Sequence, residues 1–252
     1  MNLDQRSFYD DIAEYYDLIY ADWEGSMRRH GDAIAAMLGD PDPSTCRVLD
    51  VSAGIGTQAL PLAAMGYRVV ARDLSPNAVA RLRREAQARG LTLDAEAADM
   101  REVGASVAGR FDAVVAFDNS VPHLLTDEDI RAAFSQLAAV LAPGGSILLS
   151  VRDYDSVDRA PISFHEYGER ARNGRRFRMS QEWRWRSPTH YRTTMRVEEA
   201  VGDAWTERVR TEAEYYAIPI ERILELMRDA GLVASRVVDV PFFQPVLRGV
   251  AG

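Results

Sequence analysis

Residues 49–75, LDVSAGIGTQALPLAAMGYRVVARDLS, contain the pattern that decides the fold. A short apolar strand leads into a glycine-containing turn and a helical pattern, and a second apolar strand follows and ends in an acid. Gly54 and Gly56 directly follow the first strand, where a tight turn leaves the backbone close to a ligand. Asp73 ends the second strand, 23 positions after Asp50 (73 − 50), the spacing expected for an acid that binds a pair of ribose hydroxyls. The plain alternative is a strand–turn–helix unit whose glycines serve packing and whose acid is a surface cap.

Short β-rich segments alternate with helical patterns between Arg47 and Val151. Strands are predicted over residues 46–51, 67–73, 91–97, 111–117 and 146–151, and helices over residues 57–65, 77–90 and 128–145. Gly90 ends the second of these helices. Such alternation is typical of a parallel sheet wrapped by helices, so we predict a Rossmann-like α/β domain.

The hydrophobic pattern changes after Asp155. Residues 160–214 alternate polar and apolar types, which predicts an antiparallel sheet of three or more strands with breaks near Ser187-Pro188 and Gly202-Asp203. A helix over 221–231 and strands over 232–240 and 244–252 then resume the first pattern. We therefore predict one α/β domain over 1–155 and 215–252, interrupted by an antiparallel lid over 160–214. Residues 7–38 predict two helices within an N-terminal cap over 1–40.

Composition bounds the class of protein. The hydrophobic share of 47%, the charged share of 27%, the net charge of −8 and the single cysteine, Cys46, are those of an acidic globular protein without an internal disulfide. No apolar run reaches the ~20 residues of a membrane span, and the polar N-terminus does not resemble a signal peptide, so a cytoplasmic location is expected. All 30 basic residues are arginine, which excludes a lysine Schiff base and a P-loop lysine.

Two nucleotide-like ligands fit the first half of the chain: NAD and S-adenosylmethionine. NAD sites prefer a fuller G-x-G-x-x-G, whereas Ser52 stands here where a first glycine would be. S-adenosylmethionine carries an ammonium, which suits an early acid such as Asp50. Ala98-Asp99-Met100 follows the third strand and offers an acid for an adenine amino group and an apolar face for its ring.

Five motifs in order, LDVSAGIGTQA, RDLS, AADM, FDAVVAFDNSVPHLL and LAPGGSILLSVRDYD, resemble the class I S-adenosylmethionine-dependent methyltransferases. Within this class the chain looks most like the branch with glycine and sarcosine N-methyltransferases, which have a similar NS-x-x-HL element and an R-N-Y-D-like element. The resemblance covers about residues 8–160 and returns at FFQPVL. Ser52 and Asp153 depart from it, because glycine and asparagine are usual at those positions.

The resemblance implies a seven-stranded sheet, S-adenosylmethionine as methyl donor and S-adenosylhomocysteine as product. The residues implied for the donor site are Tyr16, Asp50, Ser52, Gly54, Gly56, Asp73, Leu74, Asp99, Met100 and Phe117. Those implied for the acceptor are Tyr20, Asn119, Arg152 and Tyr154, with Asn119 and His123 as candidate catalytic residues. Arg152 would bind an acceptor carboxylate, unless it only pairs with a nearby acid such as Asp153 or Asp155. His123 would be a general base, unless it only packs the loop.

The predicted function is methyl transfer to a small-molecule acceptor, with an amine nitrogen favoured because a neutral amine needs no strong base. The alternatives are an O-methyltransferase, a non-catalytic donor-binding module and an NAD-dependent dehydrogenase. No metal site is predicted, and a homo-oligomer stays open. Nine arginines lie between Arg170 and Arg196 and are interleaved with aromatic residues. This pattern is typical of segments that bind nucleic acid. The acidic net charge and the strand alternation favour a solvent-facing sheet surface instead.

Overall fold

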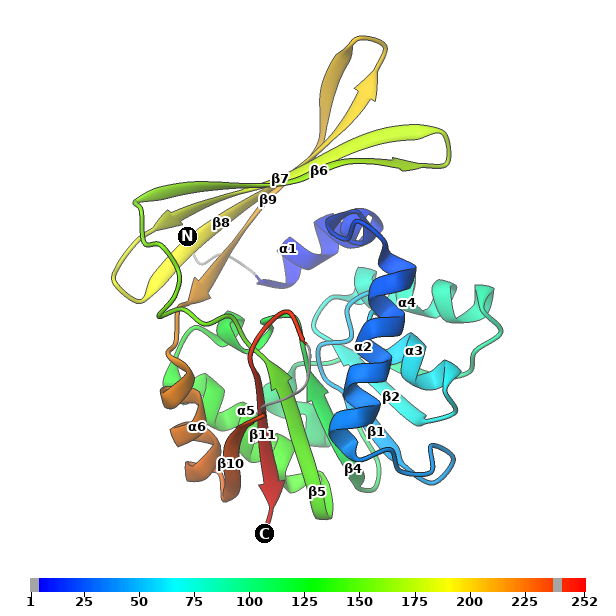
Figure 1. Ribbon diagram of the computed structural model, residues 1–252, viewed down its shortest axis with the longest axis vertical. Coiled ribbons are helices and arrows are strands. Elements are labelled where there is room, and N and C mark those ends of the chain that lie inside the picture. Colours follow the sequence, from blue (N-terminus) through cyan, green and yellow to red (C-terminus); the bar gives the residue numbers. More distant parts are fainter. Residues whose placement is uncertain (1–4, 238–241) are drawn as a thin grey trace.

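The computed structural model describes residues 5–237 and 242–252, which form an α/β body and an antiparallel lid (Figure 1). The body holds a seven-stranded sheet in the order β10-β11-β5-β4-β1-β2-β3. Its strands are β1 (Arg47–Asp50), β2 (Arg68–Asp73), β3 (Asp94–Ala97), β4 (Phe111–Ala116), β5 (Leu141–Ser150), β10 (Leu232–Val237) and β11 (Val246–Ala251). Strands β1 to β5 pair with one another in parallel, and β11 is antiparallel to both β5 and β10. The strand order reverses between β1 and β4, and ligands of open α/β sheets bind at such a point.

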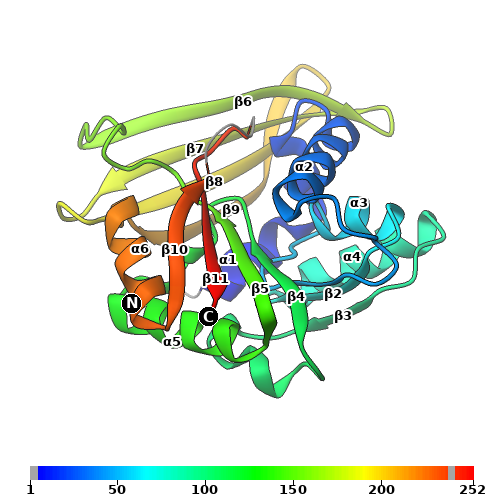
Figure 2. The ribbon, with the colours of Figure 1, turned by 60° about the horizontal axis from the view of Figure 1, so that its bottom comes forward.

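Helices cover both faces of this sheet (Figure 2). The α-helices of the described residues are α1 (Gln5–Ile12), α2 (Trp23–Leu38), α3 (Ala59–Ala64), α4 (Pro76–Ala88), α5 (Asp127–Ala139) and α6 (Ile220–Asp229), and the 3-10 helices are η1 (Ala13–Ile19), η2 (Met100–Ala105) and η3 (Val121–Leu124). Neighbouring strand residues point to opposite faces, so Val48 packs with α2 to α4 while Leu49 packs with α5 and α6. This two-sided burial explains the almost continuous apolar character of the central strands.

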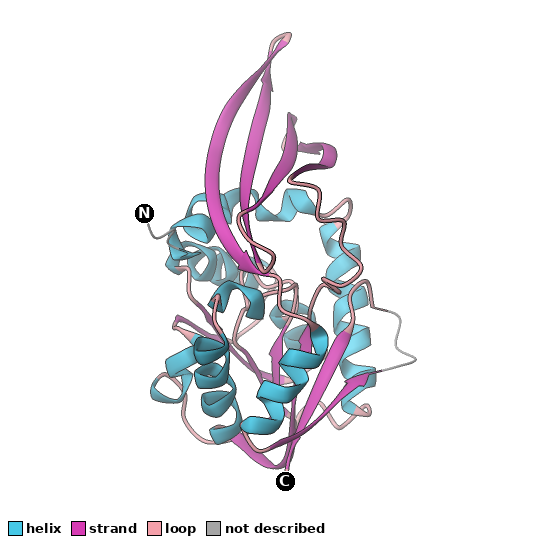
Figure 3. Cartoon of the chain, turned by 90° about the vertical axis from the view of Figure 1, so that its left-hand side faces the viewer, coloured by secondary structure: helices cyan, strands magenta, loops and turns pink. Residues whose placement is uncertain are grey.

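The lid is a four-stranded antiparallel sheet inserted between β5 and α6. It consists of β6 (Ile162–Arg172), β7 (Arg175–Trp185), β8 (His190–Val201) and β9 (Ala204–Tyr216), paired in chain order. Figure 3 shows its long strands rising beyond the helices of the body. Alternate residues of β7 and β8, among them Phe177, Met179 and Met195, pack on Phe8 and Ile12 of α1. The N-terminal helix therefore lies between the lid and the body (Figure 1).

The structure corrects two predicted boundaries. The helix predicted over 128–145 ends at Ala139, and Leu141 already pairs with Phe111 in the sheet. Pro143 cannot donate the helical hydrogen bond, and a side chain at Gly145 would meet three backbone carbonyl oxygens at 2.9 to 3.1 Å. The two helices predicted over 7–38 are three, because η1 separates α1 from α2.

The arginines of the lid are mostly neutralised by acids. Six of the nine between Arg170 and Arg196 form ion pairs, five of them with a glutamate of the lid and one, Arg172, with Asp17 of η1. Paired arginines on a sheet surface present little free positive charge to phosphates. Within residues 5–237 and 242–252, no helix is long and apolar enough to cross a membrane.

Candidate active site

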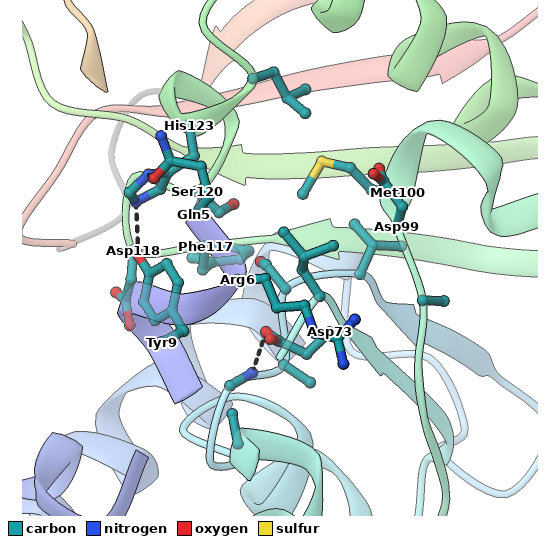
Figure 4. A pocket seen from close by; sticks show the side chains of 18 of the residues that line it. Gln5, Arg6, Tyr9, Asp73, Asp99, Met100, Phe117, Asp118, Ser120 and His123 are labelled. Atoms are coloured by element: carbon teal, nitrogen blue, oxygen red, sulfur yellow. Dashed lines mark hydrogen bonds between the residues drawn. The ribbon is translucent and has the colours of Figure 1, made fainter. Parts of the chain in front are cut away.

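A cavity of about 690 Å³, here called the donor cavity, opens where the carboxyl ends of β1, β2 and β4 meet. Eight of the ten residues predicted for the donor line it: Tyr16 of the N-terminal cap and Ser52, Gly54, Asp73, Leu74, Asp99, Met100 and Phe117 of the body. Figure 4 shows Asp99 and Met100 on one side of the cavity and Asp118 and Tyr9 on the other. The cavity is thus bounded by segments that follow β1, β2, β3 and β4, by neighbouring helices, by the cap and by Glu214 of the lid.

Asp73 holds the turn that follows β1. Its Oδ2 accepts a hydrogen bond of 2.8 Å from the Gly54 backbone N–H, and its Oδ1 accepts one of 2.8 Å from Ser75 N–H (Figure 4). Burial raises the pKa of Asp73 to about 6, although both hydrogen bonds favour the charged form. Gly54 has a φ of 51°, and a Cβ built there meets no heavy atom within 4 Å. The turn therefore presents open space to the cavity.

Gly56 has a different role from Gly54 and does not line the donor cavity. A Cβ at Gly56 would lie 2.5 to 2.6 Å from carbons of Leu82 in α4 and Leu60 in α3. This glycine therefore permits the helices to pack against the turn, and the donor contact predicted for it stays a prediction.

Replacing Gly56 by alanine is expected to lower the free energy of unfolding by about 1–3 kcal/mol. The new methyl group overlaps two leucines, and the φ of 104° is strained for any residue with a Cβ. Urea unfolding measures the change, and an unaltered midpoint and slope would contradict the packing role.

Asp50 lies behind the turn and has only 1% of its surface exposed. Its Oδ1 accepts a 3.2 Å hydrogen bond from Ser52 N–H, whereas its Oδ2 is buried without a partner in the described part of the chain. Burial raises the pKa of this carboxyl to about 8. A buried carboxylate without a cation is costly, so this position suits a ligand that brings positive charge.

The far side of the donor cavity contains Asp99 and Met100, as the sequence predicts. Arg101 binds the Asp99 carboxylate with Nη2 at 2.6 Å from Oδ2, and its backbone N–H also donates to Oδ1 at 2.9 Å. These hydrogen bonds outweigh partial burial and lower the pKa of Asp99. Asp99 is therefore ionised and oriented at the start of η2.

A second cavity of about 390 Å³, here called the acceptor cavity, lies between the cap, the lid and the ends of β4 and β5. Three residues line both cavities: Tyr9, Tyr16 and Asp118. The lid contributes four aromatic side chains, a glutamine and a methionine from its four strands: Tyr167, Gln181, Trp183, Tyr191, Met195 and Tyr215. The two cavities are therefore neighbours that share one wall.

Arg152 lines the acceptor cavity just after β5. Its Nη1 donates a 3.0 Å hydrogen bond to Tyr191 Oη, and its guanidinium lies 4.5 Å from the ring centre of Trp183. No acidic residue of the described ranges pairs with it, so pairing with Asp153 or Asp155 is not what holds it. A guanidinium without a carboxylate partner beside a cavity is a candidate site for an anion.

Asn119 connects the ends of β4 and β5. Its Oδ1 accepts from Arg152 backbone N–H at 2.9 Å, and its Nδ2 donates to Tyr154 Oη at 2.8 Å. Tyr154 Oη in turn lies 3.2 Å from Tyr191 Oη. Asn119 lines the acceptor cavity with its amide already engaged, and Tyr154 is fully buried behind it. Tyr154 does not line the acceptor cavity, so the geometry gives no support to the substrate contact predicted for it.

His123 has both ring nitrogens hydrogen-bonded. Its Nδ1–H donates to Gln5 Oε1 at 2.9 Å, and its Nε2 accepts from Tyr9 Oη at 2.7 Å (Figure 4). Burial lowers the pKa of His123 to about 3. A neutral imidazole without a free lone pair is a poor general base, so the geometry gives no support to the catalytic role predicted for His123.

Comparisons with known proteins agree with this architecture. Residues 48–145 match the model of a methyltransferase domain family. Over 151 residues the chain is 34% identical to the glycine/sarcosine N-methyltransferase of Parasynechococcus marenigrum (strain WH8102), covering 60% of this chain and 52% of that relative. Residues 48–145 therefore form a methyltransferase domain, and the relatives together with the fold support a class I S-adenosylmethionine-dependent methyltransferase. This methyltransferase family uses S-adenosylmethionine as methyl donor.

Solved structures match this chain along its whole length. Streptomyces venezuelae DesVI matches with a TM-score of 0.77 at 20% identity, over 100% of both chains. CalS10 bound to S-adenosylmethionine, an amino pentose methyltransferase from Micromonospora echinaspora, matches with a TM-score of 0.76 at 20% identity, over 100% of this chain and 99% of that one. The chain spans little more than half the length of the first two curated relatives that it matches, 52% and 57%.

Several residues that line the two cavities are absent from the set predicted from the sequence. Gln58 and Asp118 line the cavities from the start of α3 and from the end of β4, and Gln181 lines the acceptor cavity from the lid. The unusual DN pair after the fourth strand is a usable signal for Asp118. No local pattern marks the lid residues, because strand pairing alone decides which of them face inward.

Proposed function

We propose that this protein transfers a methyl group from S-adenosylmethionine, bound in the donor cavity, to an amine of a small carboxylate-bearing molecule in the acceptor cavity. The observation that carries this proposal is the shared wall of Tyr9, Tyr16 and Asp118 between two cavities, the second of which contains Arg152 without an acidic partner. A two-cavity arrangement of this kind suits transfer between two bound molecules.

The residues of the donor cavity fit the chemistry of the donor. Asp50 lies behind the turn that lines the cavity, where its unpartnered Oδ2 suits an ammonium, and Asp73 suits a ribose. The open space at Gly54 suits close approach of the ligand to the backbone, and Met100 with Phe117 offers apolar surface. When bound, the donor supplies a methyl group already activated by its sulfonium.

The chain itself has to bind, align and exclude water. Tyr9 and Tyr16 close the shared wall, and α1 with the lid covers both cavities from above. Arg152 anchors the acceptor by a charged hydrogen bond, and the buried rings of Trp183 and Tyr191 fix the guanidinium. Positioning of this kind supplies much of the acceleration of a displacement reaction.

Two measurements test the proposed function. Calorimetry with S-adenosylhomocysteine and with NAD measures which ligand binds, and release of S-adenosylhomocysteine is followed with a panel of amino acids, aminosugars, other amines and phenols. We expect donor binding and turnover with amines that carry a carboxylate. Binding of NAD alone would identify a dehydrogenase, turnover of phenols alone an O-methyltransferase, and donor binding without any turnover a non-catalytic module.

Donor binding is also expected to release protons. Asp50 has a pKa of about 8 in the protein, so it is protonated in most molecules at pH 6.5. A ligand ammonium beside it favours the charged form and expels that proton. Affinity for S-adenosylhomocysteine should therefore rise with pH between about 5.5 and 7, where the ligand's amino group stays protonated.

Calorimetry at pH 6.5 in two buffers of different ionisation enthalpy counts the released protons. We expect close to one proton for the wild type and clearly fewer for Asp50→Asn, which retains any contribution of Asp73. Equal proton release by both proteins would show that Asp50 does not contact the ammonium. Circular dichroism verifies that the variant is folded.

A further inference from the structure

We propose that Asp118 is the residue that binds the acceptor's amine and directs its nitrogen toward the donor cavity, an inference that rests on the proposed function. Asp118 follows β4 directly, at the edge of the sheet where the strand order reverses. It is the one carboxylate among the three described residues that line both cavities. A group that binds the reacting atom of the acceptor has to stand at this boundary.

One oxygen of Asp118 is held and the other is left without a partner. Oδ2 accepts from Tyr20 Oη at 2.8 Å and from Gln58 Nε2 at 3.0 Å. Oδ1 is buried and has no hydrogen-bond partner among the described residues. A buried oxygen without a hydrogen-bond donor is unfavourable. A ligand N–H that donates to Oδ1 removes this cost, and the hydrogen bond therefore favours binding.

The backbone fixes the direction of this carboxylate. Asp118 and Asn119 have φ values of 58° and 64°, a left-handed conformation that is uncommon outside glycine. The Asp118 N–H donates to Ser150 Oγ at 2.8 Å, and that hydroxyl donates to Gln244 Oε1 at 2.9 Å. Two strained residues in a row, anchored to β5, are typical of a functional site.

The charges around Asp118 favour an amine over a hydroxyl. No basic side chain of the described ranges forms an ion pair with it, and its neighbour Gln58 also donates to His30 Nδ1 at 3.0 Å. Tyr9 and Tyr16 add ring faces that attract a cation. An ammonium neutralises Asp118, whereas a hydroxyl donates one hydrogen bond and leaves the charge uncompensated.

The reacting amine is the neutral form. The bound ammonium first loses one proton to water. One of the remaining N–H groups still donates a hydrogen bond to Asp118 Oδ1. The nitrogen lone pair then forms the N–C bond while the methyl–sulfur bond breaks and its electron pair stays on sulfur. The product is a protonated methylamine, and Asp118 is unchanged.

Asp118→Asn tests this inference, because asparagine tolerates left-handed φ and removes only the charge. With the best amine of the panel we expect kcat/KM to fall about 10- to 30-fold, as for a lost charged hydrogen bond, while affinity for S-adenosylhomocysteine stays within about 3-fold. The matched hydroxy analogue, in which a hydroxyl replaces the amino group, should inhibit both proteins equally. Tyr20→Phe, which keeps the carboxylate, should lose less activity.

Two outcomes overturn the inference. One is an amine kcat/KM in Asp118→Asn within about 3-fold of the wild type; the other is an equal loss of affinity for the hydroxy analogue, which would make Asp118 structural. Asp118→Gly, which relieves the backbone strain, replaces Asp118→Asn if the latter does not fold, with the same expected losses. A wild type that methylates no amine overturns the proposed function, and this inference with it.

Discussion

The Gly54→Val variant is expected to lose at least about 100-fold in affinity for S-adenosylhomocysteine while the protein remains folded. The Cβ position at Gly54 is free of protein atoms within 4 Å and lies on the wall of the donor cavity, so the valine branches fill space that the ligand needs. The φ of 51° adds strain of about 1–3 kcal/mol. Calorimetry measures the affinity, and thermal unfolding measures the strain.

Gly90→Val is the matched control for Gly54→Val. Gly90 has a φ of 67°, also has no atom within 4 Å of its Cβ position, and is exposed beyond the end of α4. Valine there should cost similar stability and leave donor affinity within about 2-fold of the wild type. If both variants bind the ligand as the wild type does, the donor site lies elsewhere.

The contrast between Gly54 and Gly56 shows how far the sequence could predict the site. Strand, turn, helix and terminal acid in order predict the turn and the place of Asp73, because parallel strands bring their carboxyl ends to one edge. The same pattern assigns both glycines to the ligand. Only the packing of Leu60 and Leu82 separates a glycine that faces the cavity from one that faces the core.

The differences between the predicted and the observed structure share a physical cause. The helix predicted over 128–145 follows local propensity, whereas pairing of Leu141 with Phe111 ends it early. Acceptor contacts are predicted for Asn119 and Tyr154, and no local pattern shows that their polar atoms bond to each other and to the backbone of Arg152. Hydrogen bonds between residues more than 30 positions apart leave no periodic signal in a single sequence.

The lid explains why the resemblance identifies the donor better than the acceptor. The donor cavity is built mainly from the strand ends and turns of the body, where the motifs lie. The acceptor cavity takes much of its wall from β6 to β9, whose side chains follow a plain alternation, and from the N-terminal cap. The chemistry of the acceptor is therefore inferred from the charges inside that cavity, above all from Arg152.

Arg152→Leu is expected to lower kcat/KM for a carboxylate-bearing amine about 100-fold, mostly through KM, and to leave donor affinity nearly unchanged. The guanidinium lies against Trp183 and bonds Tyr191 without an acidic partner, so its charge is available to a ligand. Leucine keeps apolar contact with the rings and removes the charge. Steady-state kinetics with the amine, and calorimetry with S-adenosylhomocysteine, measure the two effects separately.

Arg159→Leu is the matched control, because Arg159 also lies over a lid tryptophan, Trp185, at 5.1 Å, but does not line the acceptor cavity. It should leave kcat/KM within about 3-fold of the wild type. The decisive comparison uses an amide or ester of the same amine, which lacks the carboxylate. Arg152→Leu should barely affect this analogue, because it never gains the charged hydrogen bond. An equal loss for acid and amide would instead make Arg152 a structural support of Trp183 and Tyr191, and an uncharged amine such as an aminosugar would then become the better candidate acceptor.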